Sequence, residues 1–378
     1  MTDTGMEANE LLETIGPEQR EILERNHFDV DEFLELRRRL LAGELGRESN
    51  KIEGNVEPPE AQDVRDYPDR DSDEAEALIA KGRAALERGE VGALVLNGGM
   101  ATRFGGVVKG CVEVVDDLSF IGLKILDARR WNAPLLLMNS FATDEKTEQH
   151  LRDIDFLGHD PSRIHRFNQN ISIRLTPNGD LFREADGGVS LYAPGHGDLP
   201  TAINRGALQA FVDGGGKYLL MSNVDNVLAS LDPLVIGAHI DSGAEMTVEC
   251  VQTEPDYKGG MVARVDGAPQ VVEHFRIPDQ FDQRQLDLLN TNTFCFDADA
   301  LDDEFDLNWY VVDKEVDGET VIQFERLAGE LSGFLRTRFL KVPNSGDESR
   351  FLPVKRPAHL EDNRVFLERV VRERGLLE

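Results

Sequence analysis

The chain has 378 residues and 40% of them are hydrophobic, so it is long enough to bury a sizeable core. Its formal net charge of −30 excludes a protein that binds nucleic acid or an anionic membrane by charge attraction. No apolar stretch approaches the length of a membrane span, and the first residues carry no basic and apolar signal, so we expect a cytoplasmic protein. The acid-rich composition, with 31 Arg against 10 Lys, fits either a high-salt cytoplasm or a coding bias towards Arg.

The chain before Val91 is predicted to be mostly helical. Apolar residues recur at helical spacing among many charges within residues 1–55, which indicates amphipathic helices. Residues 56–73 are rich in Pro and Asp and are typical of a connecting segment, and residues 75–88 show a further helical pattern. We therefore expect a helical extension and a linker over residues 1–88.

From Val91 onward, short apolar runs alternate with helical patterns, which predicts an α/β fold with a mostly parallel sheet flanked by helices. The clearest strands are 91–96, 133–138 and 217–221. The expected helices are 118–131, 144–155, 200–213 and 232–242, with Thr143, Asp144 or Asp198 as capping residues. Two alternating runs within 259–275 are joined by Asp266 and Gly267, which predicts a β-hairpin.

The cysteines suggest no redox or metal chemistry. Cys111, Cys250 and Cys295 are odd in number and far apart, which fits neither a disulfide framework nor a zinc site. We expect buried thiols without a chemical role.

A glycine-rich loop follows the first predicted strand. Four glycines fall within the nine residues 98–106, and they permit a tight loop whose N–H groups point at phosphate oxygens. Arg103 and Lys109 add positive charge, so the loop suits a triphosphate. Its spacing matches neither the dinucleotide fingerprint nor the Walker loop, and an ordinary glycine-rich turn is the alternative.

An aspartate follows another apolar strand. Asp225 lies within MSNVDN (221–226), at the carboxyl end of that strand, where ligands collect in a doubly wound sheet. One carboxylate together with substrate phosphates is a sufficient ligand set for Mg²⁺. Asp225 is therefore a candidate Mg²⁺ ligand, and the alternative is that the Asp-Asn pair only turns the chain.

A third loop, APGHGD (193–198), comes directly before a predicted helix. Gly195 and Gly197 permit a planar base or a sugar to approach the backbone. A lone histidine such as His196 is more often structural than catalytic, so its role depends on whether its neighbours bind ligand.

Together these segments resemble the eukaryotic-type UTP–glucose-1-phosphate uridylyltransferases of the UDP-sugar pyrophosphorylase family. The resemblance runs in order over most of the chain. Besides the glycine loop, its blocks are PLLLMNSFATDEKT (134–147), FNQN (167–170), APGHGD (193–198), YLLMSNVDN (218–226), YKGGMVARVDGAPQVVEHFRIP (257–278), LNTNTF (289–294), VIQFERLAG (321–329) and RFLPVKRPAHL (350–360). Each block is weak alone, but so many in one order do not arise by chance.

The resemblance implies a set of site residues. Those implied at the triphosphate are Gly98, Gly99, Thr102, Arg103 and Lys109. Gln169 and Gly195 are implied to read uracil, a task that suits an amide because it both donates and accepts hydrogen bonds. Those implied around the sugar phosphate and the sugar hydroxyls are His196, Asn223, Gly260, Glu273 and Asn292. Asp225 matches the Mg²⁺ ligand, and Lys355 matches a lysine that reaches back to the phosphates, so Lys109, Arg103 and Lys355 are the implied catalytic residues.

The chain departs from the family pattern in two ways. Ala101 stands where the loop usually has its third glycine, and Val108 stands where a proline usually precedes the lysine. Ala101 requires the loop either to avoid positive φ or to tolerate strain, so turnover or substrate choice is expected to differ. The chain also stops soon after RFLPVK, so we expect the family's C-terminal β-helix to be absent and the protein to be a monomer.

The resemblance implies a Rossmann-like, mixed but mostly parallel sheet over residues 89–378, of the nucleotide-diphospho-sugar transferase or GT-A-like type. The implied reaction is in-line attack of glucose 1-phosphate on the α-phosphorus of UTP, with Mg²⁺ as cofactor and UDP-glucose and pyrophosphate as products. The alternatives are another sugar, such as N-acetylglucosamine 1-phosphate, and a non-catalytic sensor of nucleotide sugars. The PGHGD block favours glucose, and the presence of Lys109, Asp225 and Lys355 favours catalysis.

Overall fold

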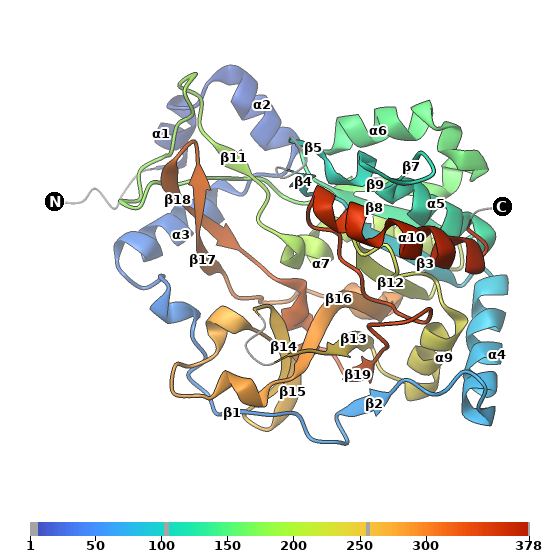
Figure 1. Cartoon of the computed structure of the whole chain (residues 1–378). Coiled ribbons are helices and arrows are strands. Elements are labelled where there is room, and N and C mark those ends of the chain that lie inside the picture. The colour runs from blue at the N-terminus through green and yellow to red at the C-terminus, as the bar shows by residue number, and fades with distance from the viewer. Residues whose placement is uncertain (1–6, 102–105, 255–257, 377–378) are drawn as a thin grey trace.

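The computed structural model describes residues 7–101, 106–254 and 258–376 (Figure 1). Its helices are α1 (Ala8–Glu13), α2 (Pro17–Arg25), α3 (Val30–Leu41), α4 (Asp73–Glu87), α5 (Phe120–Arg130), α6 (Asp144–Asp153), α7 (Leu199–Ile203), α8 (Ala207–Asp213), α9 (Pro233–Ser242) and α10 (Pro357–Glu373). Its strands are β1 (Val56–Glu57), β2 (Val64–Asp66), β3 (Val91–Leu96), β4 (Met100–Ala101), β5 (Val107–Val108), β6 (Glu113–Val115), β7 (Leu118–Ser119), β8 (Leu135–Asn139), β9 (Ile164–Asn168), β10 (Ser172–Ile173), β11 (Leu191–Tyr192), β12 (Tyr218–Asn223), β13 (Met246–Gln252), β14 (Gly260–Val265), β15 (Ala268–Glu273), β16 (Leu288–Asp297), β17 (Tyr310–Val316), β18 (Glu319–Glu325) and β19 (Thr337–Lys341).

Eleven of the described strands build one mixed central sheet, whose main path runs β2-β19-β13-β16-β12-β3-β8-β9, and the others form two-stranded pairs. Neighbours on this path are parallel except where β16 pairs with β12 and β13. Since β12, β3, β8 and β9 are mutually parallel, their carboxyl ends meet at one edge, where open α/β sheets bind ligands. The predicted α/β fold with a mostly parallel sheet is confirmed.

Helices cover both faces of the sheet, as the sequence of β3 requires. Val91, Ala93 and Val95 are buried in one apolar core with α4, α5 and α9, whereas Leu94 is buried in a second core with α7 and α8. Successive side chains of a strand point to opposite faces, so a strand that is apolar at every position is stable only when both faces are covered. Figure 1 shows α4 and α9 side by side at the edge of the molecule.

The N-terminal helices pack on a hairpin that lies far along the chain. α1, α2 and α3 share an apolar core with the β17–β18 hairpin, and Figure 1 shows them grouped together. Buried members of this core are Leu11, Leu23, Phe33, Leu36, Val311, Ile322 and Phe324. The amphipathic helices predicted within residues 1–55 are therefore confirmed, and their apolar sides are covered by the hairpin.

Residues 56–73 do more than connect. β1 pairs with β14, and β2 pairs in parallel with β19 as an edge strand of the central sheet. α4 then begins after Ser72, whose Oγ accepts a hydrogen bond from the N–H of Ala75 at 3.2 Å. Strands of two or three residues carry too little alternation to be found from the sequence.

Three details of the predicted helices are wrong. The expected helix over 200–213 is split into α7 and α8, because Gly206 takes a left-handed φ of 119° that interrupts it. Asp198 precedes α7, but its carboxylate accepts from the backbone N–H of Asn170 instead of capping the helix. Thr143 precedes α6 and also makes no side-chain cap bond within the described structure.

The predicted hairpin over 259–275 is formed by β14 and β15. Asp266 and Gly267 at its turn have φ values of 51° and 82°, the positive pair that a two-residue hairpin turn of type I′ requires. Asp and Gly supply this conformation at low cost, which is why the signal was readable in the sequence.

The thiols are free, with Cys250 and Cys295 buried and Cys111 half-buried, and burial raises the pKa of Cys111 to about 11. Burial is therefore confirmed for Cys250 and Cys295, whereas Cys111 is only partly buried, and the absence of a chemical role stays a prediction. In the ranges that the structure describes, no helix has both the length and the apolar character needed to cross a membrane.

Candidate functional site

A cavity of about 360 Å³ lies where the carboxyl ends of β3, β9 and β12 meet. Predicted site residues that line it are Gly98, Gly99, Lys109, Gln169, Gly195, His196, Asn223 and Asp225. A larger cavity, of about 870 Å³, lies beside α3 and α7, and of the candidate binding residues named above Gly197 alone is in its described lining. The topology therefore gathers at one place residues that are far apart in the sequence.

Gly98 and Gln169 lie next to each other in the wall of this cavity. A Cβ atom built on Gly98 would lie 1.9 Å from Gln169 Nε2, so any larger residue would push the amide out of this position. Ser140 holds the loop from behind, since its Oγ donates to the carbonyl of Gly98 at 2.9 Å. Gln169 is 8% exposed, and its backbone N–H donates to the carbonyl of Asn139 at 3.0 Å. Gln169 thus follows the end of β9 and is bonded to the end of β8, which places its side-chain amide at the cavity.

Lys109 and Asp225 form an ion pair at the same cavity. Their side chains are 20% and 11% exposed, so the pair is partly screened from solvent. The backbone N–H of Lys109 donates to the carbonyl of Gly99 at 3.3 Å, which closes the glycine loop next to the pair. A cation and an anion therefore face each other at this cavity, and each can form charge-assisted hydrogen bonds with a ligand.

His196 reaches the cavity as a neutral hydrogen-bond donor. Its Nδ1 accepts a bond from the N–H of Ala328 at 2.9 Å, so the ring proton must be on Nε2. Burial lowers the pKa of His196 to about 4, which keeps the ring uncharged at neutral pH. Gly195, with φ 99°, lies against the carbonyl of Arg326, where a Cβ would come within 2.8 Å. Glycine is therefore required at the turn that aims the histidine.

Asn292 is joined to the cavity through Asn223. Its Nδ2 donates to Asn223 Oδ1 at 2.9 Å. Asn292 has a left-handed φ of 55°, and the pairing of β16 with β13 shifts register beside it, which marks a β-bulge. Bulges redirect side chains next to binding sites, and asparagine tolerates this conformation better than most residues.

Gly260 and Glu273 face each other across the β14–β15 hairpin. A Cβ on Gly260 would lie 2.8 Å from Glu273 Oε1 and 3.3 Å from Asn290 Nδ2, so these groups converge on the glycine. Asn290 Oδ1 in turn accepts from the N–H of Asn292 at 2.8 Å. A chain of polar groups therefore leads from the cavity to Glu273, although neither Gly260 nor Glu273 lines the cavity itself.

A family model described as UTP–glucose-1-phosphate uridylyltransferase matches residues 30–362. The chain belongs to this family. Among curated relatives, it is 30% identical over 361 residues to the UTP–glucose-1-phosphate uridylyltransferase of Hordeum vulgare, with 87% of this chain and 71% of that protein covered. It is 29% identical over 333 residues to the UTP–glucose-1-phosphate uridylyltransferase 2 of Dictyostelium discoideum, with 81% of this chain and 63% of that protein covered.

Solved structures share the fold over nearly the whole chain. The UDP-N-acetylglucosamine pyrophosphorylase of Trypanosoma brucei, in complex with an inhibitor, has a TM-score of 0.77 at 20% identity and covers 95% of this chain and 82% of its own. A mutant UDP-glucose pyrophosphorylase of Leishmania major, in complex with UDP-glucose, has a TM-score of 0.68 at 22% identity and covers 92% and 77%. At these identities the likeness shows the fold alone, and it confirms the expected Rossmann-like architecture.

We expect the KM of this protein for its sugar substrate to depend on pH through Glu273. Burial raises the pKa of Glu273 to about 7, against the opposing charge of Arg276. If its carboxylate accepts from sugar hydroxyls, the KM for glucose 1-phosphate should rise as the pH falls from 8 to 6, because the acceptor becomes protonated. In a Glu273→Gln variant this rise should be smaller, and steady-state kinetics at both pH values measures the difference. The sugar phosphate ionises at about pH 6, and this affects the wild type and the variant alike. An equal rise of KM in the two proteins would therefore contradict the role assigned to Glu273.

Lys355 lies close to the Asp225 turn without lining the cavity. The N–H of the preceding residue, Val354, donates to the carbonyl of Asp225 at 3.0 Å, and the side chain of Lys355 is exposed. Its backbone is therefore anchored beside the Mg²⁺ ligand implied by the family, while the long side chain is free to turn towards a bound phosphate. Its predicted catalytic role stays a prediction.

The described part of the glycine loop contains two short strands, β4 and β5. β4 and β5 pair antiparallel, so Ala101 is in extended conformation and avoids the positive φ that would strain it. Val108, in the position where the family usually has proline, has a φ of −64°, the value that a proline ring enforces. Thr102 and Arg103 lie outside the described residues, so their predicted roles at the triphosphate stay predictions.

Two polar residues that support the site were missed by the sequence analysis. Asp198 is fully buried, and its carboxylate binds the backbone of Asn170, next to the predicted uracil reader. Asn226 is 1% exposed and binds the backbone that leads to Lys355. Asp198 ends the APGHGD block and Asn226 ends the YLLMSNVDN block. Their place beside predicted site residues was the signal that could have indicated a role at the site.

Proposed function

We propose that this protein transfers the uridylyl group of UTP to glucose 1-phosphate, which forms UDP-glucose and releases pyrophosphate. The observation that carries the proposal is the cavity at the carboxyl ends of β3, β9 and β12. There the glycine loop, the Gln169 amide and the Lys109–Asp225 pair converge, in a chain of the UTP–glucose-1-phosphate uridylyltransferase family. The curated relatives that bear this name match the chain at about 30% identity over most of its length.

The transfer needs charge neutralisation and alignment more than proton transfer. A phosphate monoester has a second pKa of about 6, so the attacking oxygen is ionised at neutral pH and requires no general base. The two substrates are both polyanions, so the barrier includes their mutual repulsion. In this proposal the N–H groups of the glycine loop, with Lys109 and Lys355, offset that charge, and His196 donates from Nε2 to the sugar phosphate.

Recognition of the base falls to Gln169 in this proposal. Uracil presents both hydrogen-bond donors and acceptors along its edge, and a carboxamide matches such an edge because it carries one of each kind. The distance of 1.9 Å between Gln169 Nε2 and a Cβ placed on Gly98 indicates how closely the amide and the loop are fitted. Gly195 lines the same cavity, so its backbone would lie beside the base.

We propose Asp225 as the protein ligand of Mg²⁺. Within the described ranges no cluster of three or more His, Cys, Asp or Glu side chains is arranged to hold a metal. A single carboxylate such as that of Asp225 suits Mg²⁺, which is commonly held by one or two carboxylates together with substrate phosphates and water. Bound there, the ion would neutralise charge on the phosphates of UTP. The cytoplasmic location and the monomeric state stay predictions from the sequence.

The test is a pyrophosphate-release assay with UTP and Mg²⁺ against several sugar 1-phosphates. We expect release with glucose 1-phosphate, faster than with N-acetylglucosamine 1-phosphate, and loss of activity when EDTA removes divalent ions. A preference for another sugar would overturn the choice of glucose. Binding of UDP-glucose by calorimetry, without pyrophosphate release from any sugar, would identify a sensor and overturn catalysis.

A further inference from the structure

A short backbone segment near the C-terminus, residues 350–354, lies against the turn that carries Asp225. Val354 donates its N–H to the carbonyl of Asp225 at 3.0 Å, and Asn226 forms an isolated antiparallel bridge with Pro353. Lys355 follows at once, so this contact decides where its backbone lies relative to Asp225. We refer to residues 350–354 as the docking segment.

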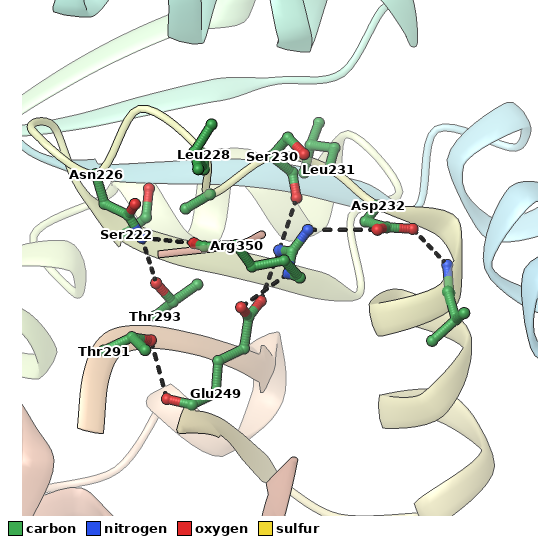
Figure 2. Close-up of polar contacts among 12 residues, drawn as sticks. Ser222, Asn226, Leu228, Ser230, Leu231, Asp232, Glu249, Thr291, Thr293 and Arg350 are labelled. Carbon is green, nitrogen blue, oxygen red and sulfur yellow. Dashed lines mark hydrogen bonds and ion pairs between the residues drawn. The ribbon is translucent and has the colours of Figure 1, made fainter. Parts of the chain in front are cut away.

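The side chain that holds the docking segment belongs to Asn226. Its Nδ2 donates to the carbonyl of Arg350 at 3.0 Å, as Figure 2 shows, and its Oδ1 accepts from the N–H of Leu352 at 3.0 Å. Nδ2 also approaches Thr293 Oγ1 at 3.4 Å. Asn226 is 1% exposed, so water cannot replace these bonds when they are lost. An aspartate would keep the acceptor and lose the donor, and an alanine would lose both.

Both backbone segments that Asn226 joins, its own turn and the docking segment, are held by further bonds. On one side, the buried ammonium of Lys124 donates to the carbonyl of Asn226 at 2.9 Å and to that of Ala229 at 2.6 Å, which holds the main chain of the turn. On the other side, the guanidinium of Arg350 binds Glu249 through bonds of 2.8 and 2.6 Å (Figure 2). Asn226 therefore joins two immobile pieces of backbone, and its amide sets the distance between them.

We propose that Asn226 is a positioning residue that aligns Lys355 with Asp225. The inference rests on the function proposed above, in which Lys355 and Asp225 act on the phosphates of one pair of substrates. Asn226 is not among the described residues that line the cavity, so it acts through the backbone on either side of it and does not touch substrate. Its amide couples the Mg²⁺ side of the phosphate site to the side that supplies the lysine.

A double-mutant cycle tests the coupling. Asn226→Ala should lower kcat by about tenfold or more, with a much smaller change in the KM for UTP, because alignment is lost and the nucleotide loop is intact. The Asn226→Ala/Lys355→Ala double variant should be no slower than Lys355→Ala alone. A general loss of structure would instead multiply the two effects. Asn226→Asp should resemble Asn226→Ala, since it loses the donor to Arg350.

Amide hydrogen exchange supplies a readout that is independent of turnover. In Asn226→Ala the amides of Leu352 and Val354 should exchange faster than in the wild type, while those of β3 do not change. In Asn226→Asp, which keeps the acceptor for Leu352, the faster exchange should appear at Val354. Should Asn226→Ala not fold, the Asn226→Asp variant carries both measurements. The matched control is Asn344→Ala, which removes an exposed amide-to-carbonyl bond, from Nδ2 to Gln252 at 2.8 Å, and should leave kcat and exchange at the docking segment unchanged.

The outcomes separate this inference from the proposed function. Wild-type turnover in Asn226→Asp, unchanged exchange, or losses that multiply in the double variant would each overturn the positioning role while the uridylyl transfer stands. A Lys355→Ala variant as fast as the wild type would do the same. A wild-type chain that releases no pyrophosphate would overturn the proposed function and this inference together.

Discussion

Replacing Asp225 with alanine should lower the turnover number by about a hundredfold or more and leave the fold intact. Asp225 is the carboxylate that we propose as the Mg²⁺ ligand, and it lines the cavity at the end of β12. Without it the protein loses its hold on the ion, so the Mg²⁺ concentration for half-maximal rate should rise as well. Steady-state kinetics over a Mg²⁺ series measures both effects, and circular dichroism checks the fold.

Lys109→Ala should lower turnover to a similar extent without raising the Mg²⁺ requirement, because the lysine acts on phosphate charge. The matched control is the surface pair Lys81–Asp241, whose N–O distance is 2.7 Å and whose side chains are both 43% exposed. An alanine at either of those positions should leave turnover unchanged, since exposed ion pairs contribute little. Near-wild-type turnover in Asp225→Ala or in Lys109→Ala would show that the corresponding role is wrong.

Gly98→Ala should raise the KM for UTP by about tenfold or more, because a misplaced recognition group costs binding and alignment. The added methyl group would lie 1.9 Å from Gln169 Nε2, so the amide must leave the position from which we propose it reads uracil. Gln169 is displaced only at the end of its side chain, so the protein should still fold. Kinetics with UTP and with CTP should show that the discrimination between the two bases narrows.

The steric origin of this effect can be tested in the same chain. In a Gly98→Ala/Gln169→Ala double variant the methyl group no longer meets an amide, so the double variant should be no worse than Gln169→Ala alone. Gly46→Ala is the matched control: a Cβ there meets nothing within 4 Å, and kinetics should be those of the wild type. An unchanged KM in Gly98→Ala would remove Gln169 from base recognition.

The part of the fold that could be predicted from the sequence is the part whose signals are local. β3 is six consecutive residues of apolar or small character followed by glycines, so both the strand and the loop were readable at one place. The Asp266-Gly267 turn was readable for the same reason. β1 and β2 were missed because two- and three-residue strands exist only through their partners, β14 and β19, which come some 200 residues or more later in the chain.

The same distinction holds for the site. Residues at strand ends, such as Asp225, were found because their position in an α/β pattern carries a meaning of its own. Asn226 was not, although it is the next residue, because its function depends on backbone groups of Arg350 and Leu352. Asp198 was assigned to a helix cap, the commonest use of an aspartate at that position, and tertiary contact with Asn170 prevailed instead.

The strand β18 ends directly behind the histidine turn. Arg326 donates its N–H to the carbonyl of Pro194 at 2.9 Å, and its own carbonyl accepts from Gly197 at 2.9 Å. The same end of that hairpin, with Val311, Ile322 and Phe324, shares an apolar core with α1, α2 and α3. Deleting those helices to obtain a shorter protein would therefore expose the apolar side of the hairpin to water. Because β18 leads directly to Arg326, the loss would also loosen the turn that carries His196 at the ligand cavity.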